Sequence, residues 1–143
     1  MANQPREKVQ NRKSKDWRTT VTVVIDFDDT IAEVFFDKQK RNLIILRPKN
    51  GVREALKEFH KLGYKVVIFS CRNNSTIVGN KEVALNAIKE FMARYNLIYD
   101  EIDTGVNGKP YGDYYIDDRG IRFENNWNEI RDRILKENPT NER

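Results

Sequence analysis

The sequence predicts an α/β protein built on a mostly parallel sheet with helices on both of its faces. Continuous apolar runs such as 21–27 and 65–70 are typical of strands that are buried on both faces. They alternate with stretches whose apolar residues follow helical spacing, at 52–62 and 81–95. Because strands that alternate with helices form βαβ units, we expect one open, mostly parallel sheet.

The first half of the chain is expected to contain a strand, a hairpin, a helix and a second strand. Residues 21–27 are apolar nearly throughout, which indicates the first strand. Residues 33–47 hold two apolar patches around the polar stretch DKQKRN, which favours a hairpin. Asn50 can cap a helix that ends at Gly63, and the next central strand follows at 65–70.

The second half repeats this alternation. The predicted elements are a helix at 81–95, a weaker strand at 98–103, a short buried strand at 114–117, and a final helix striped by Trp127, Ile130 and Ile134. A chain of 143 residues fits one domain that can bury a core without a disulfide. We therefore expect a flexible basic arm at 1–19, a folded core at 20–138 and a disordered tail at 139–143.

Composition excludes several classes of protein. The single Cys71 rules out an intramolecular disulfide and fits a reducing compartment, where we expect it to be a buried structural thiol. No run of about 18 apolar residues is present, which excludes a predicted membrane span. The N-terminus lacks the apolar core of a signal peptide. A cytoplasmic protein without a membrane partner is expected.

The net charge of +4 resides in the first 18 residues, where six Lys and Arg face two acidic residues. Clustered cations bind phosphate backbones without sequence preference, so nucleic acid is one expected partner of residues 1–18. A solvated tail is the plainer interpretation, because chain termini are commonly disordered.

Carboxylates gather where the first strand ends. Asp26, Asp28 and Asp29 directly follow an apolar run, and such charge is costly unless a cation or a reaction uses it. An Asp-rich turn is the structural explanation of the same pattern. Polar residues also follow or flank the later strands: Ser70, Lys109, Asp117 and Asp118. Because ligands of open α/β sheets bind outside the carboxyl ends of the strands, we expect these side chains to converge.

In this order the residues resemble the four motifs of the haloacid dehalogenase superfamily of phosphotransferases. The motifs are DFDDT, the Ser of VVIFS, Lys109 and YYIDD. The resemblance covers residues 20–136 and implies a Rossmann-like three-layer sandwich. The segments between motifs are too short for a cap domain, so it implies a small capless member of the bacterial and phage type, with the 33–47 hairpin as a flap. Asp29 departs from the family pattern, in which Gly is commonest.

The resemblance also assigns roles to these residues. Asp26 would be the nucleophile that forms an aspartyl-phosphate, and Asp28 would be the general acid and base. Magnesium would be held at Asp26, Asp28, Asp117 and Asp118, and phosphate oxygens would be bound at Ser70, Lys109, Asp29, Thr30 and Arg72. Asp118 could instead orient Lys109 or a metal-bound water. His60, the only histidine, is expected on the surface.

The expected function is Mg²⁺-dependent hydrolysis of a phosphomonoester, with a phosphorylated metabolite or sugar as substrate. A capless site is open, so a large substrate or a homo-oligomer could complete it. The alternatives are a 3′-phosphatase of polynucleotide ends that uses the basic arm, and a non-catalytic protein that binds phosphate or nucleic acid. A signalling receiver domain fits poorly, because no Asp closes a middle strand here.

Overall fold

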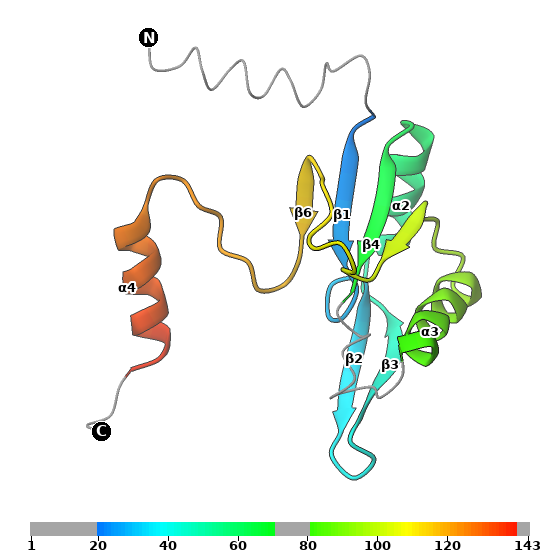
Figure 1. Cartoon of the computed structure of the whole chain (residues 1–143), viewed down its shortest axis with the longest axis horizontal. Coiled ribbons are helices and arrows are strands. Elements are labelled where there is room, and N and C mark those ends of the chain that lie inside the picture. The colour runs from blue at the N-terminus through cyan, green and yellow to red at the C-terminus, as the bar shows by residue number, and fades with distance from the viewer. Residues whose placement is uncertain (1–19, 71–80, 140–143) are drawn as a thin grey trace.

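The structure is a computed structural model that describes residues 20–70 and 81–139 (Figure 1). Along the described chain the elements are β1 (Thr22–Asp26), β2 (Ala32–Asp37), β3 (Asn42–Pro48), α2 (Val52–Lys61), β4 (Lys65–Phe69), α3 (Lys81–Arg94), β5 (Glu101–Asp103), β6 (Tyr114–Ile116) and α4 (Trp127–Glu137). The predicted alternation of strands and helices is confirmed. The chain has a mixed α/β fold.

The main sheet has four strands in the order β5-β4-β1-β6, and all three neighbouring pairs are parallel. β1 is therefore an inner strand, flanked by β4 and β6. In the register, Ile25 of β1 aligns with Ile68 of β4 on one side and with Ile116 of β6 on the other. Because parallel strands point the same way, the residues that follow these strands meet at one edge of the sheet.

The stretch between β1 and α2 forms the predicted hairpin. β2 and β3 pair in antiparallel fashion from Ala32↔Pro48 to Asp37↔Asn42, as a separate two-stranded sheet. The pairing shifts register between Glu33 and Val34. In Figure 1 the hairpin extends away from the carboxyl end of β1, next to the turn that follows this strand.

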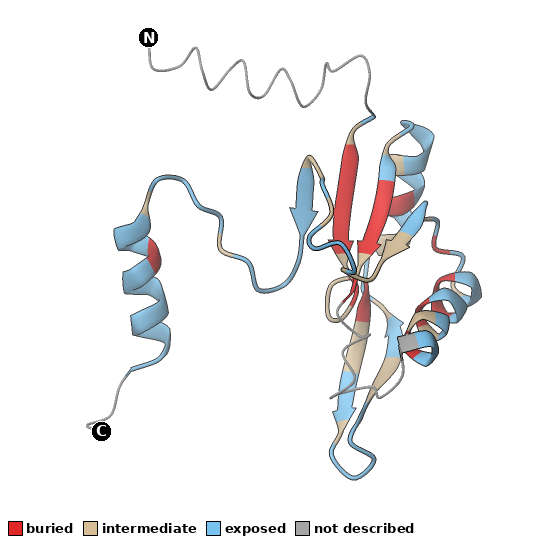
Figure 2. Cartoon of the chain, viewed as in Figure 1, coloured by how far each residue is buried: buried red, intermediate tan, exposed pale blue. Residues whose placement is uncertain are grey.

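The hydrophobic core lies on one face of the main sheet. Alternate residues of β1 and β4 supply it, among them Val23, Ile25 and Ile68. Both α2 and α3 contribute to the same cluster, through Leu56 and Met92 respectively. Figure 2 shows the burial concentrated on β1, β4 and the facing sides of these two helices. The packing of α2 and α3 thus fixes the position of the two central strands.

The other face of the sheet is approached by the loop that leads to β6. A Cβ atom at Gly112 would lie 2.5 Å from Cγ2 of Val24, so only glycine lets this loop pass so close to β1. Figure 1 shows α4 apart from the sheet, at the end of the segment that follows β6. A third layer of helices on this face remains a prediction.

Two local predictions were wrong. The strand at 114–117 was expected to be buried, but every residue of β6 is exposed, because this strand lies at the edge of the sheet beside β1 alone. The predicted cap at Asn50 is replaced by Gly51, which has a φ of 87° and makes no side-chain capping bond. A positive φ favours glycine, so the backbone rather than an Asn side chain starts α2 here.

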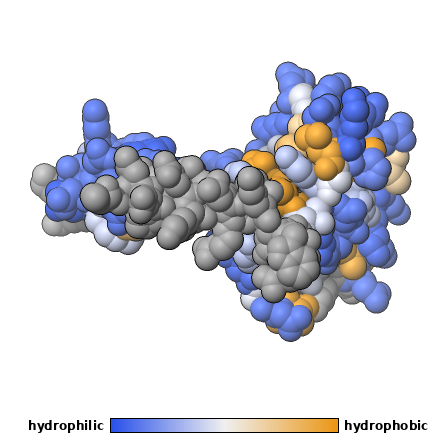
Figure 3. All heavy atoms as spheres, turned by 90° about the horizontal axis from the view of Figure 1, so that it is seen from above, coloured by the Kyte–Doolittle hydropathy of each residue, from blue (hydrophilic) through white to orange (hydrophobic). Residues whose placement is uncertain are grey.

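His60 is exposed on α2, so its predicted position on the surface is confirmed. On the face seen in Figure 3 the surface is mostly hydrophilic, with small separate hydrophobic patches. In the described part of the chain, every helix is too short or too polar to cross a membrane. The predicted arm and tail lie largely outside the described residues, as does Cys71.

Candidate functional site

The turn after β1 is built around one carbonyl group. The carbonyl oxygen of Phe27 accepts hydrogen bonds from the N–H groups of Thr30, Ile31 and Ala32, at 3.3, 3.0 and 3.1 Å. The side chains of Phe27 and Ile31 are fully buried, so they anchor the turn in the core. The intervening residues are held at its surface.

Asp29 has a φ of 62°, the left-handed region that favours glycine and tolerates Asp or Asn. Its N–H donates to the carbonyl of Ala32 at 2.8 Å, which closes the turn. Asp is among the few residues other than glycine that adopt this conformation readily, which accounts for an Asp at this position. Asp29 keeps the backbone geometry of the turn and adds a negative charge to it.

Asp26 lies half-buried at the end of β1, and its pKa is raised from 3.8 to about 6. The largest cause is desolvation by burial, followed by the negative charges of Asp28 and Asp118, with a smaller effect from Asp117. A backbone hydrogen bond from Phe27 acts in the opposite direction. The structure thus brings the acids of the first and fourth motifs close enough to repel one another.

Thr30 also contacts the nucleophile candidate directly. Its hydroxyl group donates to Oδ2 of Asp26 at 3.4 Å, a long hydrogen bond. Ser70 follows β4, and its side chain is buried beside the end of β1, where Asp26 aligns with Phe69. The N–H of Ser70 donates to the carbonyl of Asp103 at 3.2 Å. Arg72 lies outside the described residues.

The two acids of the fourth motif are held differently. One oxygen of Asp117 accepts the backbone N–H groups of Arg119 and Gly120, at 2.8 and 2.5 Å. A Cβ at Gly120 would lie 3.1 Å from that oxygen, so glycine permits this close approach. Asp118 lies 3.9 Å from the guanidinium of Arg119, a loose and exposed ion pair. The backbone therefore fixes Asp117 more firmly than Asp118.

The donor set fits a hard cation such as Mg²⁺ in its chemistry. Carboxylate oxygens are its preferred protein ligands, and Mg²⁺ usually takes only one or two of them and keeps several waters. Among residues 20–70 and 81–139, no three Asp, Glu, His or Cys side chains are close enough together to hold a metal ion by themselves. The arrangement suits a hydrated cation better than a closed metal cage. The groups that raise the pKa of Asp26 are carboxylates, whose repulsion a cation would relieve.

Lys109 is held away from the carboxylates. Its ammonium group lies 4.2 Å from the centre of the Tyr115 ring, at the distance of a cation–π contact. The hydroxyl of Tyr115 donates to the carbonyl of Pro110 at 2.8 Å, which ties the ring to the loop that carries Lys109. Lys109 and Asp117 nevertheless line the same cavity of about 490 Å³. Asp26, Asp28 and Ser70 are not among the described residues that line this cavity.

The motifs did not reveal two further contacts. Tyr115 positions Lys109, although the YYIDD strand indicated only a strand and two acids. Lys49 brings a cation to the turn: its Nζ lies 4.0 Å from Asp29 Oδ1, and its N–H donates to the carbonyl of Ile31 at 2.8 Å. A Lys before a helix is common on protein surfaces, so the sequence offered no specific signal for this contact.

The comparisons with known proteins provide no activity for this site. No family model matches the chain, and no curated protein matches it. The chain is similar to the crystal structure of an MCSG target from Vibrio cholerae, with 30% sequence identity. The match covers 82% of this chain and 99% of that one, with a TM-score of 0.47.

Proposed function

We propose that the protein is a member of the haloacid dehalogenase superfamily, with a Rossmann-like three-layer core and no cap domain. The support is the parallel sheet together with the positions of the motif acids and Ser70, which end or follow β1, β4 and β6 at one sheet edge, whereas Lys109 lies in the loop before β6. In this proposal the hairpin of β2 and β3 is a partial flap over the site. Its tip carries exposed aromatic residues, Phe35 and Phe36, that could contact a substrate.

Within that class we propose a Mg²⁺-dependent phosphomonoester hydrolase. The observation that carries this function is Asp26: a half-buried carboxylate at the end of β1 whose pKa is raised to about 6 by burial and by surrounding acids. Structural carboxylates are normally paired with cations, and clusters of repelling acids are typical of sites that bind a cation or transfer protons.

The reaction has two steps. In the first, an oxygen of Asp26 attacks phosphorus, the bond to the ester oxygen breaks, and Asp28 donates a proton to the departing alcohol. In the second, Asp28 takes a proton from a water molecule that attacks the aspartyl-phosphate. The phosphorus bond to Asp26 then breaks, and inorganic phosphate leaves with the carboxylate restored.

Magnesium would be held by carboxylates of Asp26 and Asp117 and the backbone carbonyl of Asp28, with Asp118 beside them. When bound, Mg²⁺ supplies charge neutralisation between the nucleophilic carboxylate and the phosphate oxygens. Ser70 and Thr30 would donate hydrogen bonds to these oxygens, and Lys109 would supply positive charge from the shared cavity. Asp29 and Arg72 are two further proposed contacts to phosphate, and Arg72 lies outside the described residues.

The substrate class that we propose is a phosphorylated metabolite or sugar. The cavity of about 490 Å³ that Lys109 and Asp117 line, beside the acids at the end of β1, is of the size that takes a small ligand. A polynucleotide-end phosphatase is the second candidate and would depend on the cations of residues 1–18. A homo-oligomer could help to enclose the open site.

The proposal is tested by replacing Asp26 with asparagine. Asp26→Asn keeps the shape of the side chain but removes the attacking charge, so turnover of an aryl phosphate with Mg²⁺ should fall by at least about 10³-fold. Asp132→Asn is the matched control, because Asp132 is an exposed acid on α4. Turnover by a folded Asp26→Asn protein at the rate of Asp132→Asn would refute the covalent mechanism.

A further inference from the structure

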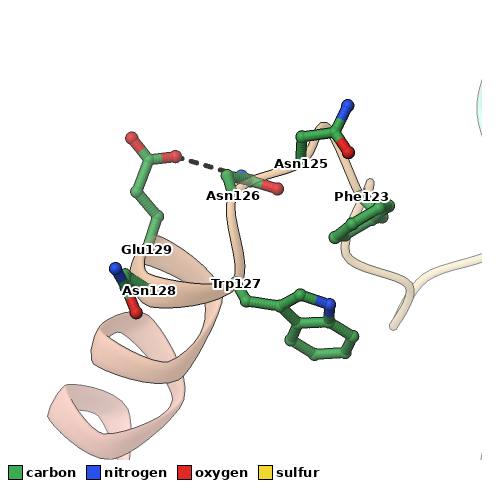
Figure 4. A pocket seen from close by; sticks show the side chains of 6 residues that line it. All are labelled: Phe123, Asn125, Asn126, Trp127, Asn128 and Glu129. Atoms are coloured by element: carbon green, nitrogen blue, oxygen red, sulfur yellow. Dashed lines mark hydrogen bonds between the residues drawn. The ribbon is translucent and has the colours of Figure 1, made fainter.

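A second cavity, of about 500 Å³, lies where the chain enters α4 (Figure 4). Its lining consists of two aromatic residues, three amides and one acid: Phe123, Trp127, Asn125, Asn126, Asn128 and Glu129. None of these residues has a role in the proposed hydrolysis. The cavity therefore requires a separate explanation.

The aromatic side chains form one wall of this cavity. The ring centres of Phe123 and Trp127 are 5.4 Å apart and the ring planes are inclined by 47°. Their exposed fractions are 51% and 70%, respectively. The two adjacent rings form a small exposed apolar patch, and the negative face of such a ring attracts C–H groups.

Part of the polar lining is already used by the helix start. Asn126 donates from Nδ2 to Glu129 at 3.0 Å and accepts the N–H of Glu124 at 2.7 Å. Figure 4 shows Asn125 on the same side as the Phe123 ring, whereas Asn128 lies on the other side of the helix start. Within the described residues the side chain of Asn125 makes no hydrogen bond, so its amide can both donate to and accept from a ligand.

The charge of the lining selects among ligands. Glu129 is the one ionisable residue of this cavity, which has no lysine or arginine in its lining. A polynucleotide or another polyanion requires cations that follow its phosphates. A neutral ring compound with hydroxyl groups instead matches aromatic faces next to amide groups, because its C–H groups can stack while its hydroxyls form hydrogen bonds.

We propose that the surface formed by Phe123, Trp127 and Asn125 is a binding site for a neutral saccharide. One face of a sugar ring stacks on the two aromatic side chains, and its hydroxyls exchange hydrogen bonds with the amide of Asn125. The indole N–H of Trp127 supplies a further donor. The site is assembled from residues that lie close together in the chain, so it depends little on the rest of the fold.

This site adjoins the candidate active site. Phe123 also lines the cavity that contains Lys109 and Asp117. A saccharide stacked on Phe123 could therefore extend a phosphate group toward Lys109. This extension rests on the proposed function and makes the substrate a phosphorylated saccharide; the saccharide site itself does not depend on that function.

The test uses the fluorescence of Trp127 in the full-length chain. Trp17 is the other of the two tryptophans, so a Trp17→Phe background leaves one reporter. The probes are neutral disaccharides of glucose, of galactose and of N-acetylglucosamine, and a ten-nucleotide single-stranded DNA, at about 50 and about 500 mM salt. We expect saturable binding of at least one disaccharide with an affinity that salt does not change.

Two matched pairs of variants locate the binding. Phe123→Ala should weaken it by about tenfold, whereas Leu135→Ala, at an apolar residue of α4 with similar exposure (56%), should not. Asn125 has a φ of 60°, a conformation that Asp also tolerates. Asn125→Asp therefore keeps the backbone but loses the amide donors, and it should weaken binding more than Asn128→Asp does. Circular dichroism and thermal unfolding of each variant check that it is folded.

Three results would overturn the proposal. These are no saturable change with any disaccharide, equal affinities within both pairs, or binding of the DNA alone. Loss of a dimer in Trp127→Ala, without saccharide binding by the parent, would instead make the aromatic pair a subunit contact. Aryl phosphate turnover is measured on the same parent protein: saccharide binding without turnover would refute the proposed hydrolase and leave the saccharide site intact.

Discussion

The two strands that flank β1 have opposite environments, although both pair with it in parallel. The three central residues of β4 are buried, and α2 and α3 cover its core face. All three residues of β6 are exposed, and the segment after it leads away from the sheet. The candidate site draws on both strands. Asp26 stands in the packed half of the molecule, and Asp117 and Asp118 stand in the exposed half.

The proposed nucleophile and the proposed metal ligand are therefore positioned in different ways. The core holds Asp26 through the buried residues of β1 and the turn that follows it, whereas backbone N–H groups within its own turn hold Asp117. Mutations in β4 should therefore damage the fold, and mutations after β6 should damage the proposed metal binding with little cost in stability.

The largest expected effect compares two isoleucines that align with the same residue of β1. Ile68→Ala should lower the free energy of unfolding by about 3 kcal/mol, because its side chain is fully buried. Ile116→Ala should lower it by less than about 1 kcal/mol, because 41% of that residue is exposed. Urea unfolding of both variants measures the difference. Equal losses would show that β6 is covered in solution.

A smaller effect is expected when the two acids of the fourth motif are compared. Asp117→Ala should raise the Mg²⁺ concentration for half-maximal activity by about tenfold or more, and Asp118→Ala by less, since a direct ligand contributes more than a neighbouring group. Titration of aryl phosphate turnover with Mg²⁺ measures both values. A larger defect in the Asp118 variant would exchange the two roles.

The smallest effect concerns the burial of Asp26 in metal-free protein. Its folded pKa, about 6, exceeds its ordinary value of 3.8, so the folded state holds the proton more tightly than the unfolded state. The ionised carboxylate therefore costs stability, and this cost grows as the pH rises from about 4 to about 6 and is complete above that range. It is absent below the ordinary pKa.

Asp26→Asn removes this cost. In EDTA it should exceed the wild type in stability by about 1 kcal/mol at pH 7.5, after allowance for the solvent screening of a half-buried group, and by little at pH 4.5. Chemical unfolding at the two pH values measures the difference. A variant that is less stable than the wild type at pH 7.5 would mean that the hydrogen bonds to the Asp26 carboxylate outweigh the cost of its burial, and it would contradict the raised pKa.

The sequence predicted the packed half of the fold well. The apolar runs of β1 and β4 have enough residues to specify strands buried on both faces, and the spacing in α2 and α3 specified the helix faces that cover them. It predicted β6 as a strand but not its exposure. Three residues, YYI, indicate strand propensity and carry no information on which elements will cover them.

The candidate site was also predictable only in part. Because the strands end at one edge of the sheet, the sequence predicted that Asp26, Asp28 and the acids after β6 converge. The raised pKa of Asp26, to which these acids contribute, reflects that convergence. The position of Lys109 over Tyr115 was not predictable, because a side chain on a loop has many neighbours within reach. The aromatic pair of Phe123 and Trp127 was likewise missed, since Trp127 had been assigned to the apolar stripe of a helix.

The central claim is that Asp26 carries the phosphoryl group during turnover. Asp28→Asn should slow the second step, because it removes the base that activates water, and should let the intermediate accumulate. Protein mixed with an aryl phosphate and Mg²⁺ is quenched in acid and digested, and the peptides are weighed by mass spectrometry. We predict one added phosphoryl group on the peptide that contains Asp26, absent in Asp26→Asn; turnover that leaves Asp26 unmodified while another residue carries the phosphoryl group would contradict the account.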